Sequence, residues 1–292
     1  MIKIFILTYA KPDDLNNNLK SLFDSYVDPR EIEVNVINNH SRIFSLNDEF
    51  KDRVKVHHQT LRANWGCGTP ARDWNQALVL GFGNLLNPLC DQIILVQDDC
   101  LWEKDWKHLL DDIHKKYTLY QCSWGDCFIS VLPEAIRKIG LYDERMCTLG
   151  NYEGDFLLRA WLYNRDKSSI NDFHHWRVWN PTVAVARRPF LGPGPRQHYL
   201  EHGQDIFDKK WGGIPAWGWN VHNIFNNPPT CRIENYMFYP YFEYDVEDLQ
   251  GKNYVAVDPS TLTRRADYAI IKNERDTDNS NGVTAGETKS NS

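Results

Sequence analysis

The sequence predicts an α/β fold built on an open, mostly parallel β-sheet. Over roughly the first 120 residues, short apolar segments typical of strands alternate with amphipathic segments typical of helices. The first of these segments, residues 2–8, is almost continuously apolar, which is typical of a strand that is covered on both faces. The chain has 292 residues, of which 42% are hydrophobic and 25% charged, so it can bury a sizeable core.

The first half of the chain contains the regular alternation. Residues 2–8 (IKIFILT) form a predicted strand, and Pro12 then begins a helix. The fixed φ of proline suits the first helical turn, and the acidic residues Asp13 and Asp14 are favoured at the positive end of a helix. The other predicted elements of this half are strands at 31–37, 53–57 and 91–96 and helices at 69–86 and 102–117.

The second half is less regular. The patterns there predict strands at 126–132 and within 177–187, and helices at 133–139, 154–163 and 197–211. Residues 226–256 are rich in Tyr, Phe and Pro, which indicates an extended segment. From residue 273 the chain has almost no apolar residues, so we expect a disordered tail.

Several common functions of α/β proteins lack their motifs here. The first strand is followed by Thr8-Tyr9-Ala10-Lys11-Pro12 instead of the glycine-rich turn of a dinucleotide-binding fold, and no P-loop is present. The net charge of −6 disfavours nucleic acid and anionic lipid. Seven cysteines without a C-x-x-C pair indicate reduced thiols. Without a leader pattern or an apolar run of ~18 residues, we expect a cytoplasmic protein with no membrane span.

The carboxyl ends of parallel strands are the usual binding edge of such a sheet. Thr8, Asn38 and the adjacent acids Asp98 and Asp99 follow predicted strands, and Asn64 follows the third one. Two neighbouring carboxylates repel each other unless a cation neutralises them, which favours a Mg²⁺ or Mn²⁺ site. The alternative is that one of these acids caps the helix predicted to start near residue 102.

A series of segments resembles the GT-A glycosyltransferases, in particular the inverting family 2 enzymes. In that family the fourth strand ends in D-x-D or N-x-D, and Gln97-Asp98-Asp99 occupies these positions. The other similar segments are LTYAKP (7–12), VINNHS (36–41), NWGCGTPARD (64–73), GDCF (125–128), IGLYDE (139–144), YEGDFLLR (152–159) and FDKKWG (207–212). The resemblance covers roughly residues 2–213 and implies a GT-A domain over 1–225. From the composition, we expect an aromatic-rich extension at 226–272 packed on this domain, followed by the tail at 273–292.

The resemblance also implies roles for individual residues. Asp99 would bind the metal ion, Mn²⁺ or Mg²⁺, and Asp98 would contact the ribose or sugar of the donor. Glu153 matches the position of the catalytic base, while Asp155 matches the second acid of that motif and is the alternative base. The residues expected to contact the nucleotide-sugar are Thr8, Tyr9, Lys11, Asn38, Asn64, Arg72, Gln97 and Asp98.

The resemblance therefore implies an enzyme that transfers a sugar from a nucleotide-sugar, UDP-linked in our expectation, to a hydroxyl of a glycan or glycoprotein. Two alternatives remain. A viral or phage enzyme, acting in the host cytoplasm, would glycosylate a base of DNA, which the basic residues Arg187, Arg188 and Arg196 favour slightly. A catalytically degenerate member would only bind glycans through some of the 11 tryptophans, which otherwise form aromatic core.

Overall fold

The computed structural model describes residues 1–9, 11–25, 27–40, 43–59, 70–122, 127–146, 151–166, 173–174, 184–186 and 197–211. All of them belong to the first of two compact units, Met1–Ala256 and Val257–Ser292. The predicted domain boundaries near residues 225 and 272 lie outside the described residues. None of the described helices is long and apolar enough to cross a lipid bilayer.

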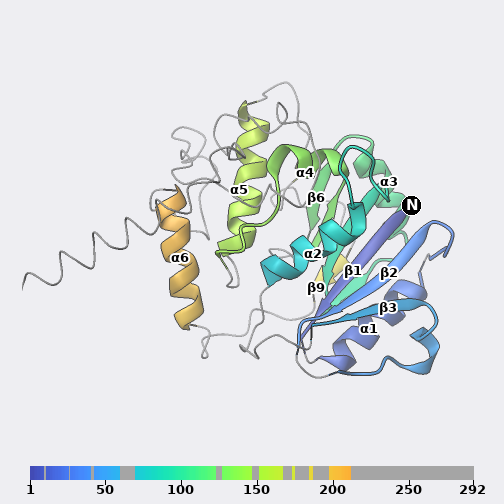
Figure 1. Ribbon diagram of the computed structural model, residues 1–292. Helices are drawn as coiled ribbons and strands as arrows, with labels where there is room; N and C mark the ends of the chain where they lie inside the picture. Colours follow the sequence, from blue (N-terminus) through green and yellow to red (C-terminus); the bar gives the residue numbers. More distant parts are fainter. Residues whose placement is uncertain are drawn as a thin grey trace, which may run out of the picture. The chain divides into compact units, whose positions relative to one another are not determined.

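A seven-stranded sheet in the order β3-β2-β1-β4-β7-β6-β8 forms the centre of the fold (Figure 1). β1 pairs in parallel with β2 and β4, β2 pairs in parallel with β3, and β7 runs antiparallel to its neighbours β4 and β6. The strands are β1 Ile2–Thr8, β2 Ile32–Asn38, β3 Val54–His58, β4 Gln92–Gln97, β6 Leu119–Cys122, β7 Phe128–Val131 and β8 Phe173–His174. The predicted α/β class with an open, mostly parallel sheet is confirmed.

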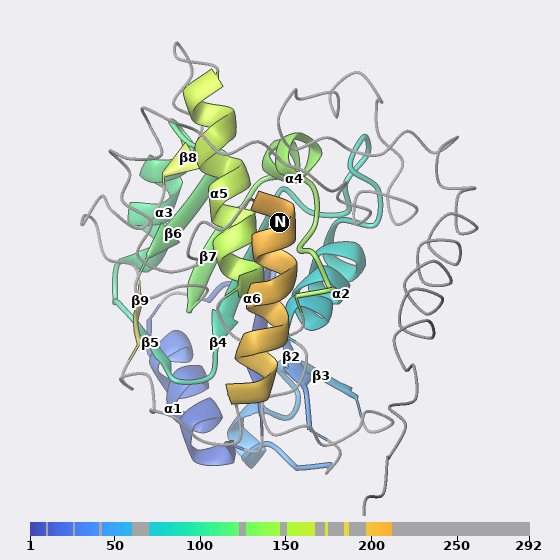
Figure 2. The same cartoon turned by 90° about the vertical axis from the view of Figure 1, so that its left-hand side faces the viewer.

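Helices cover both faces of the sheet and bury alternate residues of the same strands. Phe5 and Leu7 of β1 join one hydrophobic core with residues of α2, α4, α5 and α6. Ile4 and Ile6 join the other core with residues of α1 and α3. In Figure 2, α5 and α6 lie side by side in front of the sheet. The helices are α1 Pro12–Phe23, the 3-10 helix η1 Asp48–Phe50, α2 Pro70–Phe82, α3 Trp106–His114, α4 Pro133–Ile139, α5 Asn151–Asp166 and α6 Gln197–Trp211.

The segment after β4 differs from the prediction. Instead of entering a helix at residue 102, the chain forms β5, Cys100–Trp102, which pairs antiparallel with β9, Ala184–Ala186, and α3 begins only at Trp106. The physical reason is the burial of Trp102, whose ring packs edge-on against Trp106 with the ring centroids 4.8 Å apart. The indole N–H of Trp102 also donates a 3.0 Å hydrogen bond to Oδ1 of Asn18 on α1.

Helix α2 ends four residues earlier than predicted and approaches the sheet closely. It ends at Phe82 because Gly83 adopts a left-handed backbone conformation with φ of 67°. Two residues before Gly83, Gly81 faces β4: a Cβ atom at this position would lie 2.3 Å from Cδ1 of Ile93 and 3.2 Å from Cε2 of Phe5. Only a residue without a side chain lets the helix lie this close to the strand.

The variant Gly81→Ala is expected to lower the free energy of unfolding by about 1–3 kcal/mol, because the added methyl group overpacks the core. Helix propensity alone predicts the opposite, a gain of about 1 kcal/mol. Urea unfolding measures the difference. Adding Ile93→Val, which removes the Cδ1 atom in closest contact, should recover part of the loss. A stabilised Gly81→Ala protein would contradict the close packing of α2 on β4.

Candidate functional site

The polar residues predicted at the carboxyl edge of the sheet lie on adjacent strands. Thr8 at the end of β1 is in register with Asn38 at the end of β2, and Leu7 is in register with Gln97 at the end of β4. The backbone N–H of Asp98 donates to the carbonyl of Leu7 at 3.0 Å, so the pairing continues one residue beyond β4. The fold thus brings the ends of three strands, and their polar side chains, to one edge.

A hydrogen bond between side chains joins two of these strand ends. The hydroxyl of Thr8 donates to Oδ2 of Asp98 at 2.6 Å. Burial and the neighbouring charges of Asp99 and Asp14 raise the pKa of Asp98 to about 7, although the hydrogen bonds from Thr8 and from the backbone of Tyr9 act in the opposite direction. Near neutral pH this carboxyl group is therefore close to half-ionised, and a cation beside it would favour the charged form.

The Asp98-Asp99 pair lies on the turn between β4 and β5. This position bears on whether the pair is a helix cap or a candidate metal site. The pair does not cap α3, because the cap position of that helix is Asp105. Within the described ranges, no group of three or more His, Cys, Asp or Glu side chains is placed to hold a metal ion. Mg²⁺ and Mn²⁺ commonly use one or two carboxylates together with phosphates of the substrate, so two adjacent acids fit such an ion.

The end of β2 contributes a fixed amide. Asn38 is fully buried, and its Oδ1 accepts a 3.1 Å hydrogen bond from the backbone N–H of His40. Because that N–H can only donate, the amide has one orientation, and its Nδ2 donates to Nδ1 of His58 at 3.0 Å. The ring of Tyr9 contacts the ring of His40 edge-on, with the centroids 4.9 Å apart.

His40 and His58 were not among the predicted site residues. Their positions could have revealed them, because His58 is the last residue of β3 and His40 lies two residues beyond the end of β2, so both are at the carboxyl edge of the sheet. Lys11 lies exposed directly before α1. Asn64 lies outside the described residues.

Arg72 lies in the first turn of α2 and is tied to the segment after α4. Its Nε lies 3.3 Å from Oε2 of Glu144, and 57% of its side chain remains exposed. In the next turn, Asn75 bonds both the carbonyl and the N–H of Tyr142 at 2.8 Å and donates to Oε1 of Glu144 at 3.0 Å. Arg72 is thus anchored yet accessible, as a contact to an anionic ligand requires.

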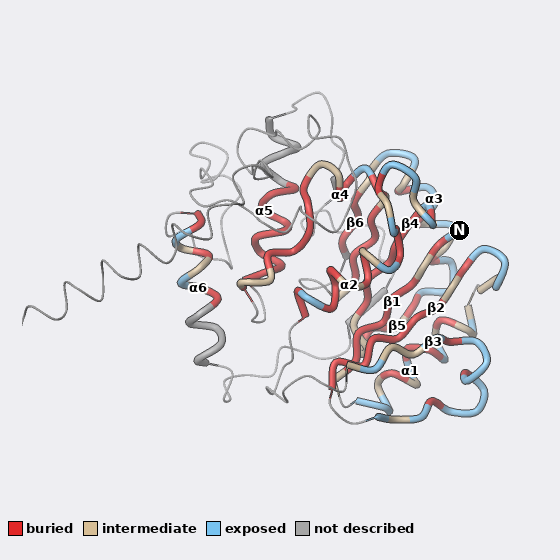
Figure 3. Tube along the Cα trace, in the orientation of Figure 1, coloured by how far each residue is buried: buried red, intermediate tan, exposed pale blue. Residues whose placement is uncertain are grey.

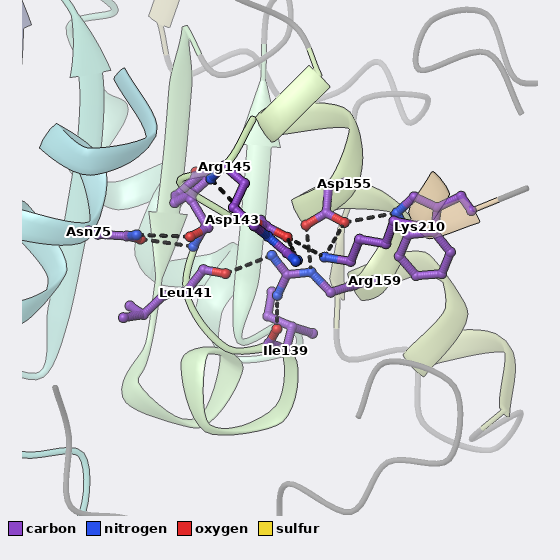
Figure 4. A network of polar contacts seen from close by, with 10 residues as sticks. Asn75, Ile139, Leu141, Asp143, Arg145, Asp155, Arg159 and Lys210 are labelled. Carbon is purple, nitrogen blue, oxygen red and sulfur yellow. Dashed lines mark hydrogen bonds and ion pairs between the residues drawn. The ribbon is translucent and has the colours of Figure 1, made fainter. Parts of the chain in front are cut away.

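The two acids predicted near the start of α5 have different surroundings. Glu153 lies in the first turn of the helix with 5% of its surface exposed. Asp155 is fully buried, and both of its oxygens accept from internal donors (Figure 4). Its Oδ2 is 3.0 Å from Nε of Arg159, and its Oδ1 is 2.7 Å from Nζ of Lys210 and 2.8 Å from Nε1 of Trp211.

A second buried acid, Asp143, shares Lys210 with Asp155. Its Oδ2 lies 3.0 Å from the Lys210 ammonium, and Arg145 binds both of its oxygens. Burial alone would raise the pKa of Asp143, but Lys210 and Arg145 outweigh that effect and hold the pKa below its ordinary value. The lysine and arginines were missed as functional candidates, although they lie in or beside the segments IGLYDE, YEGDFLLR and FDKKWG.

Helix α5 and strand β1 are oriented toward the same side of the molecule. In Figure 3 the buried first turns of α5 form its lower end, and β1 also runs downward from the N-terminus. The start of α5 and the carboxyl edge of the sheet therefore face one side of the fold. The fold and the site thus define a class: an α/β protein whose polar residues gather at the carboxyl edge of its sheet, with further acids at the start of a helix on the same side.

No protein-family model matches the sequence, and no curated protein matches it. Among solved structures, residues 1–349 of S. aureus TarS superpose with a TM-score of 0.42 at 13% identity, over 63% of this chain and 60% of that chain. The same TarS segment in complex with UDP-GlcNAc gives 0.45 at 11% identity, over 70% and 65%. The mannosyltransferase PcManGT from Pyrobaculum calidifontis, in complex with GDP-Man and Mn²⁺, gives 0.46 at 12% identity, over 78% and 70%. The chain spans less than two thirds of these two TarS chains.

Because the pKa of Asp98 is raised, its ionisation is expected to lower the free energy of unfolding as the pH increases. The folded-state value of about 7 exceeds the ordinary 3.8, so the folded protein binds this proton more tightly than the unfolded chain. The contribution of the protonated Asp98 to the free energy of unfolding is fully present below about pH 4 and is lost as the pH rises through about 7. Asp98→Asn is therefore expected to raise the free energy of unfolding of the ligand-free protein by about 2–4 kcal/mol at pH 8 and to change it little at pH 4.

Urea unfolding at the two pH values, without divalent ions, checks this prediction. The exposed acid Asp52 offers a matched control, since Asp52→Asn should follow the unsubstituted protein at both pH values. An equal effect of Asp98→Asn at pH 4 and pH 8 would contradict the raised pKa.

Proposed function

We propose that the protein is a metal-dependent glycosyltransferase of the GT-A type that inverts the anomeric centre of a nucleotide-sugar. The observation that carries this proposal is the Thr8–Asp98 hydrogen bond, with Asn38 on the adjacent strand. It joins the segment expected to contact the nucleotide to the segment expected to bind the metal ion and the sugar. Two motifs that are 90 residues apart in the sequence are thus in direct contact, which supports their assignment to one donor site.

The carboxyl edge is suited to the donor. Thr8, Tyr9 and Asn38 would contact the nucleoside, and Asp98 would contact the ribose or sugar. The sequence motifs assign further donor contacts to Lys11, Asn64 and Gln97. Asp99 would hold Mn²⁺ or Mg²⁺, which screens the charge that develops on the leaving diphosphate. Arg72, anchored by Glu144 but largely exposed, would supply a second positive contact to the phosphates.

The start of α5 is suited to the acceptor. Glu153 would take the proton of the acceptor hydroxyl while its oxygen bonds to the anomeric carbon and the bond to the diphosphate breaks. Attack from the face opposite the leaving group inverts the anomeric centre. We favour Glu153 over Asp155 as the base, because both oxygens of Asp155 already accept from Arg159, Lys210 and Trp211.

We favour UDP as the nucleotide and a hydroxyl of a glycan or glycoprotein as the acceptor. Thermal unfolding with UDP-glucose, UDP-galactose, UDP-N-acetylglucosamine and GDP-mannose, each with and without Mn²⁺, tests the donor. A ligand that binds only the folded state raises the melting temperature, so the donor should give a Mn²⁺-dependent shift. A shift with glycans alone would indicate the glycan-binding alternative, and salt-dependent binding of DNA would indicate the base-modifying one.

Asp99→Ala is expected to abolish the Mn²⁺-dependent thermal shift. It should also lower nucleoside diphosphate release from the donor by roughly 100-fold or more, because a bound metal ion contributes several kcal/mol to stabilising the transition state. The exposed acid Glu103, four residues along the chain, serves as the control in Glu103→Ala, which should behave like the unsubstituted protein. Unchanged release by Asp99→Ala would rule out Asp99 as the metal ligand.

Glu153→Gln is expected to retain donor binding and to lower kcat by about 10²–10⁴-fold, the usual contribution of a general base. Asp155→Asn instead should lower the melting temperature strongly, because it leaves buried cations without their carboxylate partner. Steady-state kinetics and thermal unfolding of the two variants separate the roles. If Asp155→Asn folds normally and loses transfer while Glu153→Gln remains active, the base is Asp155.

A further inference from the structure

A cluster of buried charges joins α5, α6 and the segment that follows α4. Its central member is Lys210 on α6, whose ammonium lies 3.0 Å from Asp143 and 2.7 Å from Asp155. The side chains of Lys210, Asp143, Asp155 and Arg159 are fully buried. Figure 4 shows Lys210 between the two carboxylates, with Arg159 on the same side of Asp155.

Stability alone does not explain such a cluster. Charges taken out of water lose their hydration, and a buried ion pair is often no more stabilising than apolar residues of similar volume. A buried ion pair does constrain geometry, because each donor must point at its acceptor. Lys210 therefore restricts the positions of the two segments that carry Asp143 and Asp155.

The cluster fixes both the rotation and the axial position of α5. Asp155 and Arg159 are four residues apart, so they lie one turn apart on the same face of the helix. Arg159 donates to the carbonyl of Ile139, the last residue of α4, and to that of Leu141 just beyond it, while Asp155 is held by Lys210. Two successive turns of α5 are thereby bonded to two other segments of the chain.

The first of these turns carries Glu153, two residues before Asp155. A rotation of α5 by one residue would turn Glu153 by about 100°, and an axial shift of one residue would move it by about 1.5 Å. Misplacing a catalytic group by about 1 Å can cost roughly 100-fold in rate. The same lysine holds Asp143, whose neighbour Glu144 binds Arg72 on the donor side.

We propose that Lys210 is a positioning residue for the catalytic base: its ammonium, held between Asp143 and Asp155, sets the orientation of Glu153 relative to the donor. This inference rests on the proposed function, with Glu153 as the base. Lys210 itself does not touch the substrate. Its effect on the rate passes through Asp155 and the first turn of α5.

A double-mutant cycle tests the proposal, using Lys210→Met, Glu153→Gln and the double variant. The assay is nucleoside diphosphate release from the nucleotide-sugar of the panel that gives the largest Mn²⁺-dependent thermal shift. All proteins are compared at least 15 °C below their melting temperatures. Lys210→Met is expected to lower kcat by about 10–100-fold with the donor KM changed less than about twofold. In the Glu153→Gln background it should lower kcat no further.

Controls distinguish positioning from a general loss of structure. Lys107→Met removes a lysine paired with Asp111 on the surface of α3 and should leave kcat unchanged. If Lys210→Met does not fold, Trp211→Phe removes one donor to Asp155 while keeping an aromatic ring, and the same cycle is run with it.

The measurements distinguish a failure of the positioning role from a failure of the proposed function. The proposal is overturned if the variant lowers the melting temperature but leaves kcat unchanged, or if it slows the Glu153→Gln protein by the same factor as the original one. If no nucleotide-sugar is bound or cleaved by the unsubstituted protein, the proposed function fails. If Glu153→Gln retains full kcat, the choice of base fails and the positioning role falls with it.

Discussion

Burial of the central strands on both faces is the constraint on which the rest of the structure depends. β1 and β4 supply alternate residues to two separate hydrophobic cores, so both faces of their middle residues are covered by apolar side chains. Polar side chains that reach water are confined to the ends of these strands. Because the two strands are parallel and in register, their ends coincide, and Thr8 meets Asp98 there. The location of the candidate site is thus a consequence of how the core is built.

The protein places its charges in two contrasting environments. At the carboxyl edge, Asp98 and Asp99 lie beside each other on one turn, and the pKa of Asp98 is raised. In the α5–α6 cluster, each carboxylate contacts at least two cationic or N–H donors, and the pKa of Asp143 is lowered. The first arrangement is the one to which we assign the cation of the proposed function, whereas the carboxylates of the second are paired with cations of the chain itself. This contrast separates acids suited to ligand binding from acids that hold the helices in place.

Much of the fold was predictable from the sequence because the central strands are rich in apolar, β-branched residues. Near-continuous apolar runs identified β1 and β4, the segment EIEVNVI identified β2, and Pro12 and Pro133 marked helix starts. β6 at Leu119–Cys122 and β5 were not predicted, and the next helix was expected to start at Trp102, the last residue of β5. Both are short strands, and β5 depends on contacts of Trp102 with α1 and α3 that are distant in sequence. Local patterns carry no information about such partners.

The candidate site was predictable in part for the same reason. Motif order indicated Thr8, Asn38, Asp98 and Asp99, and the parallel register brings their strands together. The resemblance assigned the base to Glu153 and kept Asp155 as the alternative, but it could not show what surrounds either acid. Two of the partners of Asp155 come from a helix that begins more than 40 residues later, so only the folded chain reveals that both of its oxygens are occupied.

Asn18 gives the acidic turn a property that bears on binding energetics. Its Nδ2 donates to the carbonyl of Gln97, just before the turn, and its Oδ1 accepts from the indole of Trp102, just after it. One buried amide of α1 is therefore hydrogen-bonded to both ends of the segment that carries Asp98 and Asp99. A turn held in this way is already ordered before any ligand arrives. A ligand that binds there loses little free energy to ordering the chain, so more of its contact energy is available as affinity.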